Sequence, residues 1–297
     1  MKYIYAIGLA VTLSILAGFM FIFPALDTKQ QLSLYQAPFE KQCKEFHRAL
    51  VEDKKWGAVT QKYLAQFEQE EGILMDELFN VTGLTPAQWE QCKVMCQEPF
   101  NQQEALLAQR PTPEDSIKEE LQGEDALISE QSQSTVQTLL EKFNLCPHVS
   151  ILVHDNALSP VSATLRHISI NPMEIDQNSL EAITCHEIQH ILHNDCYIRS
   201  VVANLNSLGM QCSIDEAWLN SFMSRLCKFQ ETRADILASL VHPQYALDIS
   251  NDLLASMDEY HDFVNQVNSM HPSHAERDAY LKVVHQEIVQ SMGVIIS

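Results

Sequence analysis

The segment at residues 186–190, His-Glu-Ile-Gln-His, constrains this chain more than any other feature of its sequence. Two histidines four residues apart lie on one face of a helix, about one turn from each other, so both imidazoles can reach one tetrahedral zinc ion. We predict that this helix spans residues 178–193 and is buried, because apolar residues surround the motif. These residues are Leu180, Ile183, Ile188, Ile191 and Leu192.

A catalytic zinc needs a third protein ligand and an open fourth position. A second long helix is predicted at residues 215–240 and carries Glu231, which completes a ligand set with His186 and His190. Asp235 lies one turn further along the same face and can accept the free N–H of a ligand histidine. Glu187 follows the first histidine, where its carboxylate can take a proton from a zinc-bound water. The sequence therefore predicts one zinc ion per chain.

The order of these motifs resembles the HtpX and CAAX prenyl protease family of gluzincin metallopeptidases. The shared pattern is HExxH, then ExxxD on a downstream helix, then His271-Pro272 and Arg277. It covers roughly residues 149–290 and is most similar to the periplasmic BepA-like members with a single membrane segment. The resemblance implies a zincin-like endopeptidase with Glu187 as general base and protein or peptide substrates.

Further roles come from the same resemblance. It implies that a strand at residues 165–170 forms the sheet edge that receives an extended substrate backbone. It also implies that His271, as a catalytic group, or Arg277 stabilises the oxyanion or ties the last helix to the site, with His274 as an equal candidate. That last helix is predicted to begin at Pro272 and Ser273 and to end near Gly293.

Residues 3–26 contain no charged residue and no His, Asn or Gln, and they are long enough to cross a bilayer as a helix. Lys2 favours an N-terminus in the cytoplasm. We interpret residues 1–26 as a retained single-pass anchor that leaves the catalytic domain outside the cytoplasm, in the periplasm. The alternative is a cleaved signal and a secreted product.

The composition predicts a mainly α fold, because only 8 Gly and 11 Pro occur in 297 residues, and two β-rich runs add a small β-sheet (α+β). Residues 149–153 and 165–170 are the predicted strands, in a hairpin or joined by a longer loop. A further helix is expected at residues 250–267. We divide the chain into the segment 1–26, a helical region of unknown role at 27–145 and a zinc metallopeptidase domain at 146–297.

The acidic composition of the chain argues against one class of partner, nucleic acid. The chain has 39 Asp and Glu against 19 Lys and Arg, a formal charge of −20. No nucleic-acid partner is expected, since binding to phosphates needs clustered Lys and Arg.

Eight cysteines are compatible with an oxidising compartment. A disulfide from Cys92 or Cys96 to Cys43 is more plausible than one between the first two, whose side chains point the same way. The remaining histidines, including His47 and His193, are interpreted as surface or hydrogen-bonded groups.

Two other hypotheses remain open at this stage. One is a catalytically inactive zinc-binding relative that acts as a membrane-tethered binding or chaperone-like module. The other is a helical scaffold without metal.

Overall fold

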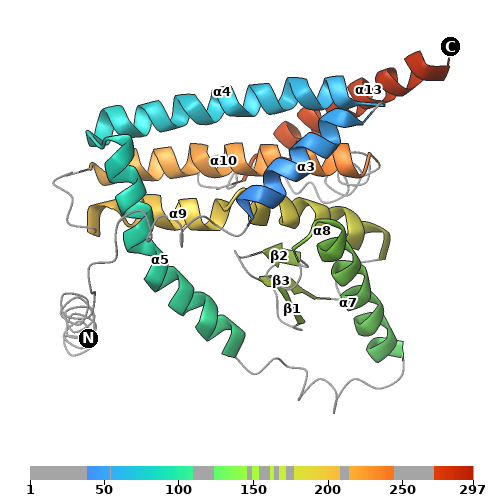
Figure 1. The fold of residues 1–297 in the computed structure, drawn as a ribbon, viewed down its shortest axis with the longest axis horizontal. Helices are drawn as coiled ribbons and strands as arrows, with labels where there is room; N and C mark the ends of the chain where they lie inside the picture. The colour runs from blue at the N-terminus through green and yellow to red at the C-terminus, as the bar shows by residue number, and fades with distance from the viewer. Residues whose placement is uncertain are drawn as a thin grey trace. The chain divides into compact units, whose positions relative to one another are not determined.

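The computed structural model describes residues 39–53, 55–109, 124–145, 149–153, 161–163, 167–171, 177–207, 214–243 and 271–296. This part of the chain is predominantly helical (Figure 1), which confirms the prediction from composition. The anchor predicted at residues 3–26 and the helix predicted at 250–267 lie outside the described residues. Among the described helices, none combines the length and the apolarity that a membrane span requires.

The elements that position the candidate site are long helices and three short strands. In chain order they are α3 (Glu40–Glu52), α4 (Gly57–Thr82), α5 (Pro86–Gln109), α7 (Glu124–Lys142), β1 (Ser150–Val153), β2 (Val161–Ala163), β3 (His167–Ile170), α8 (Gln177–Leu192), α9 (Asp195–Ala203), the 3-10 turn η1 (Leu205–Ser207), α10 (Glu216–Val241) and α13 (His274–Ile296).

Local sequence signals explain where several helices begin and end. The Asp215 carboxylate accepts a 3.0 Å hydrogen bond from the Ala217 N–H and caps α10. Thr85 and Gln88 bond each other reciprocally at the start of α5, with Pro86 in the first helical position. Gly83 has a left-handed φ of 69°, which closes α4 without the steric cost that a side chain would bring.

A second reciprocal cap begins α13. The Ser273 N–H donates to Glu276 at 2.7 Å, and the Glu276 N–H donates to the Ser273 hydroxyl at 3.2 Å. We expect Ser273→Ala to lower the free energy of unfolding by about 1 kcal/mol, because the substitution leaves a helix N–H without its partner. Urea unfolding measures this change. Ser291→Ala in the same helix is the control, with an expected change within about 0.5 kcal/mol, and equal losses in both variants would contradict the capping role.

The three described strands form one sheet in the order β1-β3-β2. β1 runs parallel to β3, with Ser150 opposite His167, so of the two predicted arrangements the hairpin is wrong and the longer connection agrees with the structure. β2 pairs antiparallel with the other side of β3, with Ala163 opposite Ile168. β3 is therefore the central strand, and the prediction that residues 165–170 form the substrate-binding edge is also wrong. β1 and β2 are the two edges of the described sheet, and β2 was not among the strands predicted from the sequence.

The helices before residue 145 share a core with those after it. α4, α10 and α13 pack together, and α4 and α10 run side by side in Figure 1. The described residues from 39 onward belong to one compact unit, and the helices on the two sides of residue 145 pack against each other within it. The shared core consists of Tyr63, Phe67, Phe229, Ile236, Leu237, Leu240, Val284 and Ile288.

Candidate metal centre

Two packed helices bring the predicted zinc ligands together. α8 carries His186 and His190, α10 carries Glu231, and the two helices are in extensive contact. All three side chains are buried. Apolar residues hold α8 in the interior, with Leu180, Ile188, Ile191 and Leu192 all less than 2% exposed. The fifth residue predicted there, Ile183, is half-buried.

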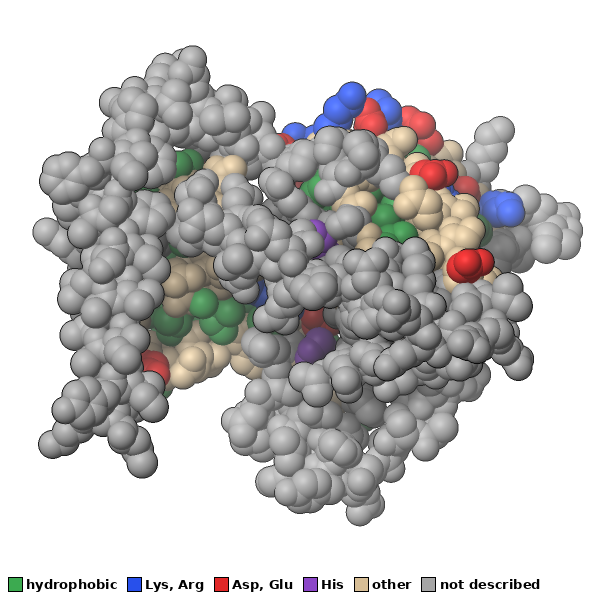
Figure 2. Space-filling model, turned by 90° about the horizontal axis from the view of Figure 1, so that it is seen from below, with side chains coloured by type: hydrophobic (Ala, Val, Ile, Leu, Met, Phe, Trp, Pro, Cys, Tyr) green, Lys and Arg blue, Asp and Glu red, His purple; other side chains and the backbone are tan. Residues whose placement is uncertain are grey.

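The three potential ligand atoms lie at the corners of a small triangle. His186 Nε2 is 3.1 Å from His190 Nε2 and 3.3 Å from Glu231 Oε2, and His190 Nε2 is 3.4 Å from Glu231 Oε1. Two ligand atoms that each lie about 2.1 Å from one tetrahedral zinc ion are about 3.4 Å apart. The three separations therefore fit one metal ion with three protein ligands. Histidine and acidic side chains are visible in the middle of the face shown in Figure 2.

Each histidine is oriented through its other ring nitrogen by a buried aspartate. Asp235 lies 2.8 Å from His186 Nδ1, in the position that the helical spacing predicts. Asp195, at the start of α9, lies 2.8 Å from His190 Nδ1. A carboxylate at Nδ1 favours a proton on that nitrogen and leaves the lone pair of Nε2 directed at the other ligands.

Arginines compensate the charge of both buried aspartates. Arg277 binds Asp235 through Nε and a terminal nitrogen, at 2.8 and 2.7 Å, and the Tyr280 hydroxyl also donates to this carboxylate. Burial opposes ionisation of Asp235, but Arg277 and His186 hold its pKa well below the usual range. Burial also opposes ionisation of Asp195, yet Arg233 and His190 lower its pKa to about 2. Both groups are anionic at neutral pH.

Two further residues contact the Glu231 carboxylate. A terminal nitrogen of Arg199 donates to Oε1 at 2.9 Å, and His271 Nδ1 lies 3.2 Å from Oε2. The His271 side chain is 61% exposed, so it lies at the open side of the cluster. Arg277 binds Asp235 and so connects α13 to the site, which is one of the two roles expected for it. The side chain of His274 lies outside the described residues.

Glu187 is a half-buried residue of α8, the helix that packs against the edge strand β2. Burial raises the pKa of its carboxyl group, and the neighbouring His186 and His190 partly oppose this shift. The backbone of Ala163, on β2, forms a hydrogen bond with the carboxylate. The candidate general base therefore lies beside the edge strand and close to the histidine pair.

The sequence analysis missed Asp195, Arg199 and Tyr280. Asp195 comes five residues after His190, and this closeness is a usable signal for a carboxylate that orients a ligand histidine. Arg199 and Tyr280 come from other helices and show no pattern in the sequence that connects them to the motif.

The predicted disulfide to Cys43 is wrong. Cys43, Cys92 and Cys96 are free thiols, as are the other described cysteines, Cys185, Cys196 and Cys227. The Cys43 sulfur lies instead beside His47, 3.8 Å from Nε2. Cys146 and Cys212 lie outside the described residues.

Comparisons with known proteins do not assign the chain to a family. No protein-family model matches the chain. No curated protein matches it, and no solved structure does. The functional interpretation therefore depends on the residues and geometry of the site.

Proposed function

We propose that this protein is a zinc-dependent endopeptidase that hydrolyses peptide bonds with a water molecule activated by Glu187. The observation that carries the proposal is the triangle of His186, His190 and Glu231, whose separations of 3.1 to 3.4 Å fit one tetrahedral metal ion. The resemblance to gluzincins agrees with this ligand set. We further propose a membrane-anchored enzyme with its catalytic domain in the periplasm, acting on envelope or misfolded proteins.

A zinc ion held by these residues supplies a Lewis acid that polarises a carbonyl group and acidifies water. Glu187 accepts the proton of the attacking water and later passes it to the amine that leaves. Its raised pKa suits a group that must hold this proton between the two steps. Asp195 and Asp235 keep the imidazoles in the orientation that binding requires.

The sheet edge supports a binding mode for the substrate. In the described sheet, β2 has a strand neighbour on one side only, and the Glu187 carboxylate lies at Ala163 of this strand. An extended peptide that pairs with an exposed strand is held by main-chain hydrogen bonds. A peptide held along β2 would pass close to Glu187 and the histidine pair, so we assign to β2 the role that the resemblance gave to residues 165–170.

The ligand triangle would also serve the alternative function, a catalytically inactive zinc-binding module. Arg199 donates to Glu231 Oε1 at 2.9 Å, and in either function this guanidinium competes with a metal ion for that oxygen. An inactive relative would bind zinc without cleaving peptides. Both functions therefore predict the same zinc content, but only the endopeptidase cleaves peptides.

The first test measures zinc in the purified full-length chain. We expect His186→Ala and Glu231→Ala each to lower the zinc content by about one ion per chain, because two protein ligands hold zinc far more weakly than three. Elemental analysis after gel filtration measures the zinc content. His285→Ala on α13 is the matched control and keeps the zinc content of the unmodified chain. Unchanged zinc in folded His186→Ala and Glu231→Ala variants would overturn the proposed site.

A further inference from the structure

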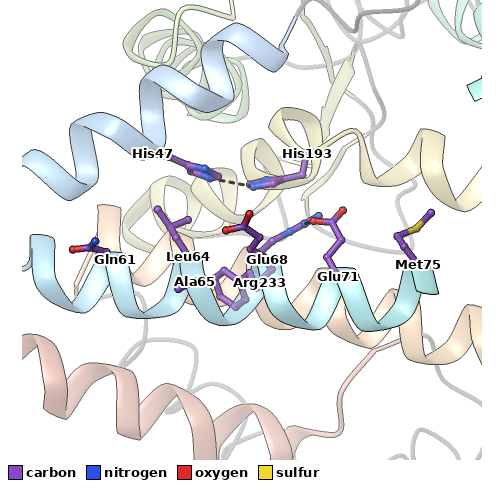
Figure 3. A pocket seen from close by; sticks show the side chains of 11 residues that line it. His47, Gln61, Leu64, Ala65, Glu68, Glu71, Met75, His193 and Arg233 are labelled. Atoms are coloured by element: carbon purple, nitrogen blue, oxygen red, sulfur yellow. Dashed lines mark hydrogen bonds and ion pairs between the residues drawn. The ribbon is translucent and has the colours of Figure 1, made fainter. Parts of the chain in front are cut away.

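A second group of metal-binding side chains lies outside the proposed catalytic centre. Cys43 and His47 are four residues apart on α3, and His193 follows the end of α8. His47 Nε2 lies 3.8 Å from the Cys43 sulfur and 3.2 Å from His193 Nε2. All three potential ligand atoms lie within 4.8 Å of one another. Figure 3 shows the two imidazoles pointing toward each other, His47 from α3 and His193 from the turn after α8.

Two of the three separations fit a metal bound by one sulfur and two nitrogens, and the third, from the Cys43 sulfur to His193, is no more than 4.8 Å. A tetrahedral zinc ion with a Zn–S distance of about 2.3 Å and Zn–N distances of about 2.05 Å places sulfur and nitrogen about 3.6 Å apart and two nitrogens about 3.4 Å apart. The observed separations of 3.8 and 3.2 Å are within about 0.2 Å of these values. Small shifts of the side chains would complete the geometry.

The His193 ring already has the orientation of a ligand. Its Nδ1 lies 2.8 Å from the carbonyl oxygen of Gln189 and donates to it, which leaves the lone pair of Nε2 directed at His47. A backbone carbonyl is a common partner for the second nitrogen of a metal-bound histidine. Burial, together with the charge of Arg233, lowers the pKa of His47 to about 4.

A pocket of about 670 Å³ gives access to the cluster. His47 and His193 form part of its wall, and Glu68 and Glu71 on α4 face the pocket in Figure 3. The pocket provides an entry path and leaves room for a water or a carboxylate as a fourth ligand.

Charge at the cluster must also favour a cation. Arg233 lines the same pocket and repels a metal ion. Its guanidinium is already paired, with Asp195 at 2.5 Å and with Glu71 at 3.4 Å. Binding also releases the proton of Cys43, whose pKa burial raises to about 12 in the metal-free cluster. The thiolate then adds a negative charge that offsets the approaching cation.

We propose that Cys43, His47 and His193 form a second transition-metal site, suited to zinc, which fastens α3 to the end of α8. The thiolate and imidazole ligands favour zinc over magnesium or calcium. His193 lies three residues after His190, so the same helix end serves both metal sites. The second site does not depend on the proposed peptidase function.

Cobalt distinguishes the two sites because it replaces zinc and reports sulfur ligation by colour. We expect metal-free, full-length chain to bind about two Co²⁺ ions and to show a thiolate-to-cobalt charge-transfer band in the near ultraviolet. The site of His186, His190 and Glu231 contains no sulfur and cannot produce this band. Glu231→Ala should therefore lose about one cobalt ion and keep the band.

Substitutions at the second site should change the charge-transfer band, which Glu231→Ala leaves in place. Cys43→Ser and His193→Gln should each lose about one cobalt ion, and Cys43→Ser should lose the band completely. Cys96→Ser on α5 is the control for cobalt bound to another thiol, and it should keep both the band and the stoichiometry. Circular dichroism checks the fold, and His193→Gln alone decides the outcome if Cys43→Ser does not fold. A missing band in the unmodified chain, or a band that survives both substitutions, would overturn the second site.

Discussion

Glu187→Gln is expected to lower the rate of peptide-bond hydrolysis by about 10²- to 10⁴-fold, the usual contribution of a general acid–base residue. The amide has nearly the shape of the carboxylate but cannot accept a proton from water. Glu187 is absent from the triangle of potential ligand atoms, so the zinc content should stay that of the unmodified chain. The combination of retained metal and lost turnover identifies a base rather than a ligand.

A quenched-fluorescent peptide library, followed by mass spectrometry of the products, measures this loss. Glu181→Gln on the same helix is the matched control, because Glu181 is a partly exposed carboxylate with no place among the potential ligand atoms. Equal cleavage by Glu187→Gln and the unmodified chain would contradict the proposed mechanism. Zinc without cleavage in the unmodified chain would instead favour the inactive binding module.

Local spacing explains why much of the candidate site is predictable from sequence. A helix repeats every 3.6 residues, so a motif such as HExxH fixes which side chains share a face. The same rule places Glu231 and Asp235 one turn apart on α10. The caps at Asp215 and Ser273 are equally local, because each joins residues two or three positions apart. These features need no knowledge of how the helices pack.

The rest depends on contacts between segments that are distant in sequence. The sheet order depends on β2, which pairs with β3. A strand of three residues is too short to show a recognisable pattern of alternating apolar residues in the sequence. Arg199 reaches Glu231 from α9, and Tyr280 reaches Asp235 from α13. His193 meets His47, which lies 146 residues earlier in the chain. Such contacts depend on tertiary packing, which periodicity within one helix does not encode.

The packing of α4 also changes the interpretation of the region before residue 145. Tyr63 and Phe67 of α4 lie in one apolar cluster with Phe229 of α10 and Val284 of α13. Phe67 and Phe229 meet edge to face at 6.3 Å between ring centroids. The helix that carries Glu231 is thus partly covered by α4. This part of the region contributes to the core that positions the ligands, so its role is structural whatever other role it has.

Asp235→Ala is expected to lower the free energy of unfolding by about 3–5 kcal/mol, the usual cost of removing one partner of a buried ion pair. Asp235 is fully buried and binds His186, Arg277 and Tyr280. The substitution leaves these three polar groups without their shared acceptor. Asp278→Ala is the matched control on α13, since Asp278 pairs with the exposed Lys282 and such surface pairs contribute about 0–1 kcal/mol.

The same substitution should also weaken zinc binding by about 10- to 100-fold, because His186 loses the carboxylate that orients it. Chemical unfolding of the metal-free chain measures the stability effect alone, and competition with a chelator measures the affinity of the folded variant. A stability loss no larger than that of Asp278→Ala would contradict the role of the buried network. Unchanged zinc affinity in a folded Asp235→Ala chain would show instead that α8 alone orients His186, because the imidazole would then keep its ligand geometry without help from α10.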